Sequence, residues 1–314
     1  MSIDRVATSA QTAYFLSQIQ NAGSALDKTQ EKIASGKNAN SYAGFGNQTQ
    51  VLTATIAANA RNNAYATATK FAVTQTDLQD THLTSLADLA AKLKKAVSDA
   101  VANNDASTLM AQVRSIFDQA SGILNSKDAN GDYIYAGGKT GVAPVTVTSL
   151  ADLQALPSLA GAFANGDLKK SVQVADGVNV SYGLTASDVG AGLMQALKDI
   201  AAFDVGGSGN LDAATSLSAA QNGFLSGAIA TLTTTATDLH AVSAANGYVS
   251  NRLTDSQTHQ TSMDTLYKGF VSGIQDTNMA EAATQLSLNQ TQLQASLAVT
   301  STLHQLSLLN YMPQ

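Results

Sequence analysis

Glycine and proline are distributed so unevenly along this chain that they divide it into regions of different structure. Neither residue occurs from Asn47 to Ser121 or from Ile274 to Met312, so long uninterrupted helices can form in both segments. Between Gly131 and Gly209 the glycines instead occur in clusters, together with Pro144 and Pro157, which is typical of turns and short strands. The chain therefore combines helical ends with a middle region of a different kind.

Apolar residues recur at helical spacing near both termini. In the N-terminal segment, spacings of three and four residues alternate along the series Leu16, Ile19, Gly23, Leu26, Gln30 and Ile33. In the C-terminal segment they join Met279, Ala283, Leu286, Gln290, Leu293 and Leu297, and a second face carries Leu288, Ala295, Leu303 and Leu306. Such steps are typical of a coiled-coil seam. A helix with two apolar faces needs two neighbours.

These terminal seams must be buried, because helices in water are stabilised mainly by packing against partners. Pairing the two seams within one chain covers one face of each helix, and the other face then points to further copies. Contacts of this kind that run head to tail without closing build a helical filament. An ordinary intramolecular helical bundle has the same periodicity and remains an alternative. The residues expected at the assembly interface are Ile3, Val6, Leu16, Ile19, Leu26, Ile33, Met279, Leu286, Leu293, Leu297, Leu303 and Leu306.

Between the terminal segments we expect further helices and one hairpin. Apolar periodicity predicts one helix ending near Val101, a second starting near Asp105, and a mostly continuous helix over Leu211–Gln275. Alternation from Val172 to Tyr182 around Asp176-Gly177 predicts a β-hairpin.

Two further strands and a short helix complete this expectation. The strands are Tyr133–Tyr135 and Val142–Val147, and the helix runs from Val189 to Phe203 after a Ser187-Asp188 cap. The fold class is therefore mainly α, a long antiparallel or coiled-coil helical bundle from both termini with a small α+β insert.

The search for catalytic or binding chemistry gives a negative result. Charged residues make up 13% of the chain and the net charge is −6, unlike the basic surface of a nucleic-acid-binding protein. Cysteine is absent, and no two of the four histidines have the i, i+3 or i, i+4 spacing of helix-borne metal ligands. Gly138-Lys139-Thr140 lacks the first glycine of a phosphate-binding loop, and Asp128-x-Asn130-x-Asp132 lacks the glycine and glutamate of a calcium loop. We predict no enzyme activity, no metal site and no cofactor.

Membrane and export signals are also missing from the sequence. No run of 18 apolar residues occurs, which argues against a membrane span. The first residues lack the basic and apolar regions of a cleaved secretory signal, so we expect that any export uses another route.

Both ends of the chain carry distinctive blocks of sequence. The N-terminal block is LDKTQEKIASGKNANS at 26–41, and the C-terminal blocks are DTNMAEAATQL at 276–286, QTQLQASLAV at 290–299 and LSLLNY at 306–311. These blocks resemble the flagellin family, which includes filament and hook–filament junction proteins. The segment DYIYAGGKT at 132–140 is similar to the junction proteins, also called hook-associated protein 3. One departure is Tyr42-Ala-Gly-Phe-Gly46, where the family usually has an acidic pair.

This resemblance implies a structural subunit of the extracellular bacterial flagellum, in the filament or at the hook–filament junction. It implies type III export without a cleaved signal peptide, and as partners copies of the chain itself, other flagellar axial proteins and an export chaperone. It divides the chain into terminal assembly helices (1–46 plus 276–314), a long-helix rod domain (47–145 plus 211–275) and a surface-exposed insert (146–210). Hinge positions would be Gly36, Gly44 and Gly46. A cell-surface adhesin or ligand-binding protein on the same helical scaffold is the alternative.

Overall fold

The computed structural model describes residues 3–309, and side chains are described for residues 10–302. The chain forms two compact units. The first, which we call the terminal unit, combines Met1–Arg61 with Met263–Gln314, and the second, the central unit, comprises Asn62–Ser262. Two long helices, α2 (Thr49–Asn103) and α6 (Ala219–Gln275), contribute residues to both units.

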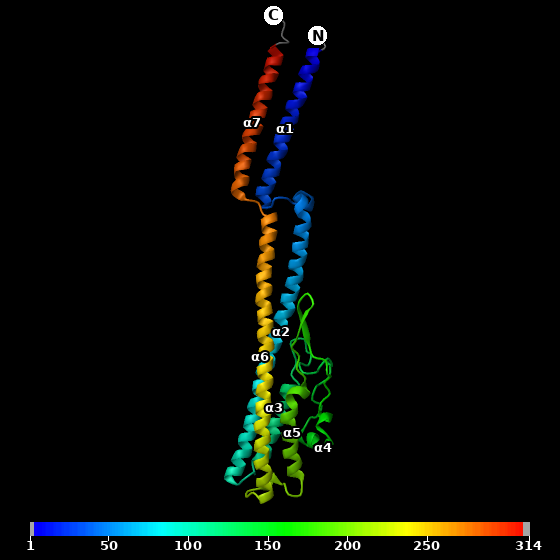
Figure 1. Ribbon diagram of the computed structural model, residues 1–314, viewed down its shortest axis with the longest axis vertical. Helices are drawn as coiled ribbons and strands as arrows, with labels where there is room; N and C mark the ends of the chain where they lie inside the picture. Colours follow the sequence, from blue (N-terminus) through cyan, green and yellow to red (C-terminus); the bar gives the residue numbers. More distant parts are fainter. Residues whose placement is uncertain (1–2, 310–314) are drawn as a thin grey trace. The chain divides into compact units, whose positions relative to one another are not determined.

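The terminal unit is built around α1 (Ile3–Ser35) and α7 (Met279–Leu309), which lie side by side and antiparallel (Figure 1). Helix α1 ends where Gly36 takes the left-handed conformation, with φ of 67°, which is typical of a helix C-terminus. Helix α7 begins after Asn278, whose side-chain Oδ1 accepts a hydrogen bond from the backbone N–H of Ala280 at 3.2 Å. A short 3-10 segment, η1 (Tyr42–Gln48), precedes α2.

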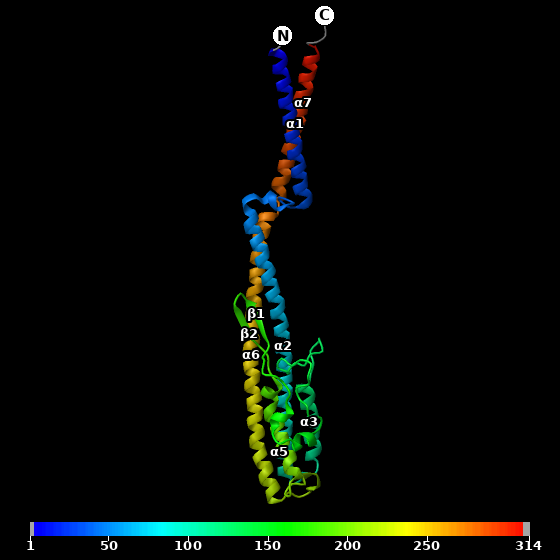
Figure 2. The ribbon, with the colours of Figure 1, turned by 90° about the vertical axis from the view of Figure 1, so that its right-hand side faces the viewer.

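The central unit packs α2 and α6 with two shorter helices, α3 (Leu109–Leu124) and α5 (Ala186–Val205) (Figures 1 and 2). The short elements α4 (Leu150–Ala155), η2 (Leu159–Ala162) and η3 (Leu211–Ala213) lie in the connections. All four of these helices contribute to the main apolar core, which includes Leu86, Leu93, Phe117, Leu197 and Leu232. A mainly α fold with a small insert is therefore confirmed.

The predicted hairpin is present as β1 (Ser171–Ala175) and β2 (Val178–Ser181), paired antiparallel. Gly177 adopts a φ of 73°, which a tight hairpin turn requires. The inward-facing residues of the two strands form a small core with Ala72 of α2 and Leu253 of α6. The alternation therefore predicted the hairpin, and of its apolar residues Val178, beside the turn, is 42% exposed.

The two further predicted strands are wrong. Within the described residues, Tyr133–Tyr135 and Val142–Val147 make only isolated bridges, between Lys127 and Tyr133 and between Val145 and Phe163. The chain turns immediately after the first segment through two glycines with positive φ, and Pro144 interrupts the second because it has no N–H to donate.

Helix starts also differ from the prediction. Helix α5 is capped by Thr185, one turn before the Asp188 that we expected within the cap: Thr185 Oγ1 accepts a hydrogen bond from Asp188 N. Helix α3 begins at Leu109, and α6 begins at Ala219 after a capping pair in which Ser218 N donates to Gln221 Oε1 and Gln221 N donates to Ser218 Oγ. At α5 and α6 the start is set by a side-chain cap that apolar periodicity does not detect, whereas the N-cap residue of α3, Thr108, makes no such hydrogen bond.

Candidate assembly surface

The contact between α1 and α7 is made by small and polar residues. Ala22, Thr29, Ala282 and Asn289 are buried there. Asn289 Nδ2 donates to the backbone oxygen of Ala25 at 3.1 Å and to Thr29 Oγ1 at 2.9 Å. A buried amide that finds its partners at one alignment only fixes the register of two helices. Asn289 is not among the seam residues that apolar periodicity predicts.

The large apolar residues of the predicted seams stay partly exposed. Leu16, Met279 and Leu297 are 57%, 49% and 50% exposed. Five further predicted residues are intermediate in burial, namely Ile19, Leu26, Ile33, Leu286 and Leu293. Ile3, Val6, Leu303 and Leu306 lie outside the residues whose side chains the structure describes. The single chain therefore leaves apolar area uncovered on this helix pair.

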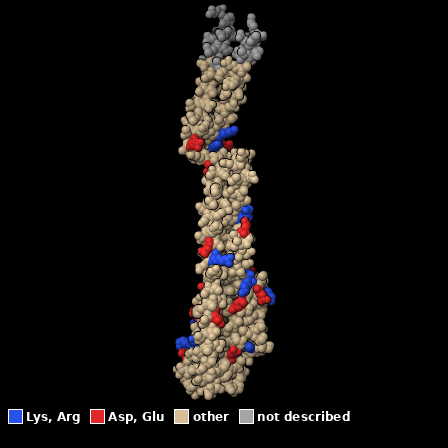
Figure 3. Space-filling model, in the orientation of Figure 1, with Lys and Arg blue, Asp and Glu red and all other residues tan. Residues whose placement is uncertain are grey.

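Charge is absent from most of the helix pair. No Asp, Glu, Lys or Arg occurs from residue 10 to 26 or from 282 to 302. In Figure 3 the face of the pair that is visible is free of charged atoms except at the end near the linkers. A surface with Gln, Asn, Ser and Thr between partly exposed Leu, Val and Tyr can be buried without leaving unpaired charges.

Each of the three predicted hinge glycines lies where a larger residue would be unfavourable, two because of their backbone conformation and one because of a steric clash. Gly36 and Gly46 have φ of 67° and 54°, a region that non-glycine residues rarely adopt. At Gly44 an added Cβ would lie 2.4 Å from the Cβ of Ala39. Their role as hinges stays a prediction.

Asn38 joins the linker after α1 to the linker before α7 by hydrogen bonds. Its backbone N–H donates to Gln275 O at 2.7 Å, and its side-chain Nδ2 donates to Ile274 O and Asp276 O at 3.1 and 2.9 Å. Thr277 returns two bonds, from its N–H to Gly36 O and from its hydroxyl to Asn38 Oδ1. The partners are more than 230 residues apart in sequence, so no local pattern reveals this contact.

Amide side chains also join α2 to α6 within the central unit. Asn246 Nδ2 donates to Thr76 O at 2.8 Å, and Gln260 Nε2 donates to Thr69 Oγ1 at 3.0 Å and to Val174 O of β1 at 2.8 Å. Asn246 and Gln260 are both buried. Gln260 thus links two helices and the hairpin at one point.

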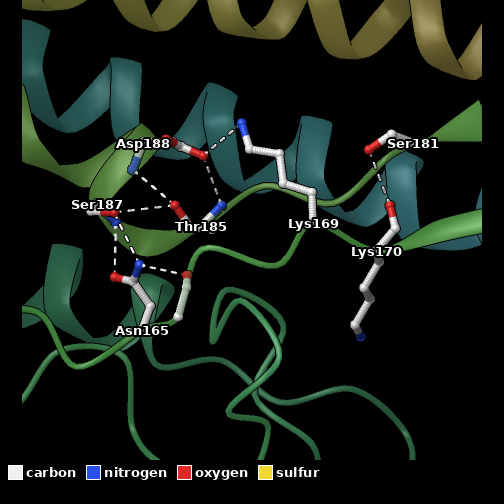
Figure 4. Close-up of polar contacts among 8 residues, drawn as sticks. Asn165, Lys169, Lys170, Ser181, Thr185, Ser187 and Asp188 are labelled. Atoms are coloured by element: carbon white, nitrogen blue, oxygen red, sulfur yellow. Dashed lines mark hydrogen bonds and ion pairs between the residues drawn. The ribbon is translucent and has the colours of Figure 1, made fainter.

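The start of α5 carries the densest polar network of the insert (Figure 4). Asn165 Nδ2 donates to Ser187 Oγ at 3.0 Å, and the Ser187 N–H donates back to Asn165 Oδ1 at 3.2 Å. Lys169 Nζ lies 3.1 Å from the Asp188 carboxylate. Burial opposes ionisation of Asp188, but hydrogen bonds from Lys169 and Thr185 outweigh it and lower its pKa. These contacts anchor loop 164–170, and no reactive group is exposed by them.

Among the histidines whose side chains the structure describes, His82 on α2 is the most enclosed. Its Nδ1 lies 3.1 Å from the hydroxyl oxygen of Tyr135 and 3.4 Å from that of Ser126. Burial lowers the pKa of His82 and raises the pKa of Tyr135. Among the residues that the structure describes, no group of three or more His, Asp or Glu side chains could hold a metal ion. The helices of the described part include none that is long and apolar enough to cross a membrane.

The fold defines a mainly α protein whose N- and C-terminal helices return to form one antiparallel pair. Residues 229–312 of this chain match the family model for the bacterial flagellin C-terminal helical region. This match confirms the resemblance to the flagellin family over the C-terminal part of the chain.

One curated relative is flagellar hook-associated protein 3 of Salmonella typhimurium, 28% identical over 144 residues. The match covers 45% of this chain and 45% of the relative, so the chain spans under half the length of that protein.

Solved structures show the same fold. A Vibrio parahaemolyticus protein described as flagellar hook-associated is similar with a TM-score of 0.56 and 18% identity, over 72% of this chain and 96% of that one. Bacillus cereus FlgL gives a TM-score of 0.53 and 12% identity, over 70% and 98%.

Proposed function

We propose that this chain is a structural subunit of the bacterial flagellum, placed at the junction between hook and filament, and that it assembles through α1 and α7. The observation that carries the proposal is the α1–α7 pair, which buries small and polar residues inside and leaves large apolar residues partly exposed outside. An uncovered surface without charge is suited to contact further helices.

The relatives support the position at the junction. The curated relative and the two solved structures described above are named as hook-associated proteins or FlgL. The chain then acts outside the cell as part of the flagellum, after export without a cleaved signal peptide. Its partners are copies of itself, neighbouring axial proteins and an export chaperone. The role is structural rather than enzymatic.

The expected domain division follows from this role. Segments 1–46 and 276–314 act as assembly helices, 47–145 and 211–275 as the rod, and 146–210 as the surface insert. The predicted interface residues, among them Leu293 and Leu297, lie on the helices that make the contact.

A charge placed on α7 tests the proposal. Leu293→Asp should abolish assembly, because its carboxylate would be buried between helices without a partner. The measurement is sedimentation and negative-stain electron microscopy of the full chain in ammonium sulfate, which strengthens apolar burial. Assembly may be scored as filaments, short oligomers or addition to the ends of isolated hooks.

Two variants control this experiment. Leu293→Met keeps an apolar side chain of similar size and should assemble as the unchanged chain does. Gln112→Asp adds the same charge at an exposed position of α3 in the central unit and should leave assembly unchanged. Normal assembly of Leu293→Asp would contradict the proposed interface. Failure of the unchanged chain to associate, combined with saturable ligand binding by the insert, would favour an adhesin.

A further inference from the structure

Three lysines lie near the end of α1 and the linker that follows it in the terminal unit. Lys28 and Lys32 are four residues apart on α1 and therefore share one face, where like charges repel. With Lys37 they line a hollow at the end of α1, which we call the basic hollow. All three lysines are exposed, and none forms an ion pair with any residue that the structure describes.

The acidic residue within the hollow does not neutralise it. Glu31 lines the same hollow, but its Oε1 accepts a hydrogen bond from Asn40 Nδ2 at 2.6 Å. One carboxylate against three ammonium groups leaves a net positive site. Serine and asparagine complete the lining and can donate further hydrogen bonds to an anion.

A complementary charge lies on the other helix of the pair. Glu281 is the only acidic residue of α7, and no Lys or Arg occurs in that helix. Its side chain is exposed and forms no ion pair with the described part of the chain. The chain therefore carries an unpaired acid and an unpaired basic hollow on separate helices of one unit.

We propose that the basic hollow of one copy receives Glu281 of a second copy. This inference rests on the proposed self-assembly and names a contact within it. The two patches differ, so each copy can offer its Glu281 to one neighbour and its hollow to another. Contacts of this heterologous kind repeat from copy to copy without being used up in a dimer.

Other acidic residues of the terminal unit suit the hollow less well. Asp27 and Glu31 lie on α1 beside Lys28 and Lys32, so a copy that presented them would also bring its own lysines to the hollow. The carboxylate of Asp276 accepts a hydrogen bond from Ser272 of its own chain. Asp264 forms an ion pair with Lys268 on its own helix. Among the side chains that the structure describes in this unit, Glu281 is therefore the carboxylate whose own helix carries no Lys or Arg.

A charge exchange tests the contact in the full chain. Glu281→Lys alone, and Lys28→Glu with Lys32→Glu, should each raise the critical concentration for assembly about 10-fold, because like charges then meet. Combining all three substitutions should return it to within about 3-fold of the unchanged chain. Glu281 is also in the first turn of α7, where an acid favours the helix dipole. If Glu281→Lys acted only by losing this favourable interaction with the helix dipole, substitutions on α1 would not restore assembly. Recovery in the combined variant therefore indicates the contact between copies.

Cross-linking provides a second readout, because the chain has no cysteine. Chains with Lys32→Cys are mixed with chains with Glu281→Cys and treated after assembly with a short bis-maleimide, whose two ends each add one thiol across a carbon–carbon double bond and whose length spans the distance that the two side chains bridge. A cross-linked heterodimer is expected in the mixture, and no cross-linked dimer in either variant alone. The contact would be overturned if the unchanged chain assembled but the mixture gave no heterodimer. It would also be overturned if the combined variant had a critical concentration as high as that of the single changes. Either result would leave the proposed function intact. Failure of the unchanged chain to associate in any form would overturn both.

Discussion

At the scale of single residues, the loop that follows Tyr135 depends on a close approach between two glycines. Gly137 has a φ of 57°, and a Cβ added to it would lie 1.9 Å from the backbone oxygen of Gly166. The same contact is supported by a hydrogen bond from Gly166 N to Ala136 O at 2.9 Å. Gly131, in the preceding turn, also has a positive φ of 86°, but an added Cβ there meets nothing within 4 Å. An alanine at Gly131 would therefore introduce backbone strain alone, whereas an alanine at Gly137 would introduce backbone strain and a steric collision.

We expect Gly137→Ala to destabilise the protein far more than Gly131→Ala. The latter should cost about 1–2 kcal/mol, the strain of an alanine in the left-handed region. Gly137→Ala adds a collision with backbone that cannot rotate away and should lower the free energy of unfolding by about 3 kcal/mol or more. Urea denaturation followed by circular dichroism measures both values. Equal losses for the two variants would show that the loop moves to accommodate the methyl group.

At the scale of elements, the long helices are paired by amides as well as by apolar residues. The sequence predicted α6 and the hairpin because their signals are local, as with Asp176-Gly177. It did not predict the bonds of Asn38, Asn246 or Gln260, because their partners are distant in sequence. The alternating run from Val142 to Val147 was mistaken for a strand for the same reason: a strand requires a partner, and the segment pairs only at Val145.

The pairing of α2 and α6 should depend on Asn246. Asn246→Ala should lower the free energy of unfolding by about 1–3 kcal/mol, because the buried oxygen of Thr76 loses this donor and a cavity is left. Asn251→Ala, on an exposed position of the same helix, is the matched control and should change it by less than about 0.5 kcal/mol. Thermal and urea unfolding give the comparison. A loss no greater than that of the control would mean that the amide contributes nothing to the pairing.

At the scale of the whole molecule, assembly and folding stability are assigned to different parts of the chain. Every residue of the main apolar core lies between Leu83 and Leu239, and every residue of the hairpin core lies between Ala72 and Leu253. Both cores fall inside the central unit, Asn62–Ser262. The terminal unit contributes the α1–α7 pair, whose buried contact, among the side chains that the structure describes, consists of Ala22, Ala282 and the Asn289–Thr29 hydrogen bond. A contact so poor in large apolar side chains adds little to folding stability, and its partly exposed flanks are consistent with a surface completed by neighbours.

A fragment comprising residues 62–262 should therefore fold and fail to assemble. Because it keeps both cores, we expect a cooperative thermal transition with a Tm within about 5 °C of that of the full chain, which corresponds to about 1–2 kcal/mol in a domain of this size. Because it lacks α1 and α7, it should remain monomeric in ammonium sulfate at concentrations where the full chain associates. Circular dichroism melting and sedimentation velocity measure the two properties on the same sample. Limited proteolysis of the full chain gives an independent check, since cleavage should remove both ends first and stop near this fragment. If the fragment unfolds without cooperativity, the terminal helices are needed to stabilise the fold of α2 and α6. If the fragment still assembles, the assembly interface lies in the central unit and not on the terminal helices.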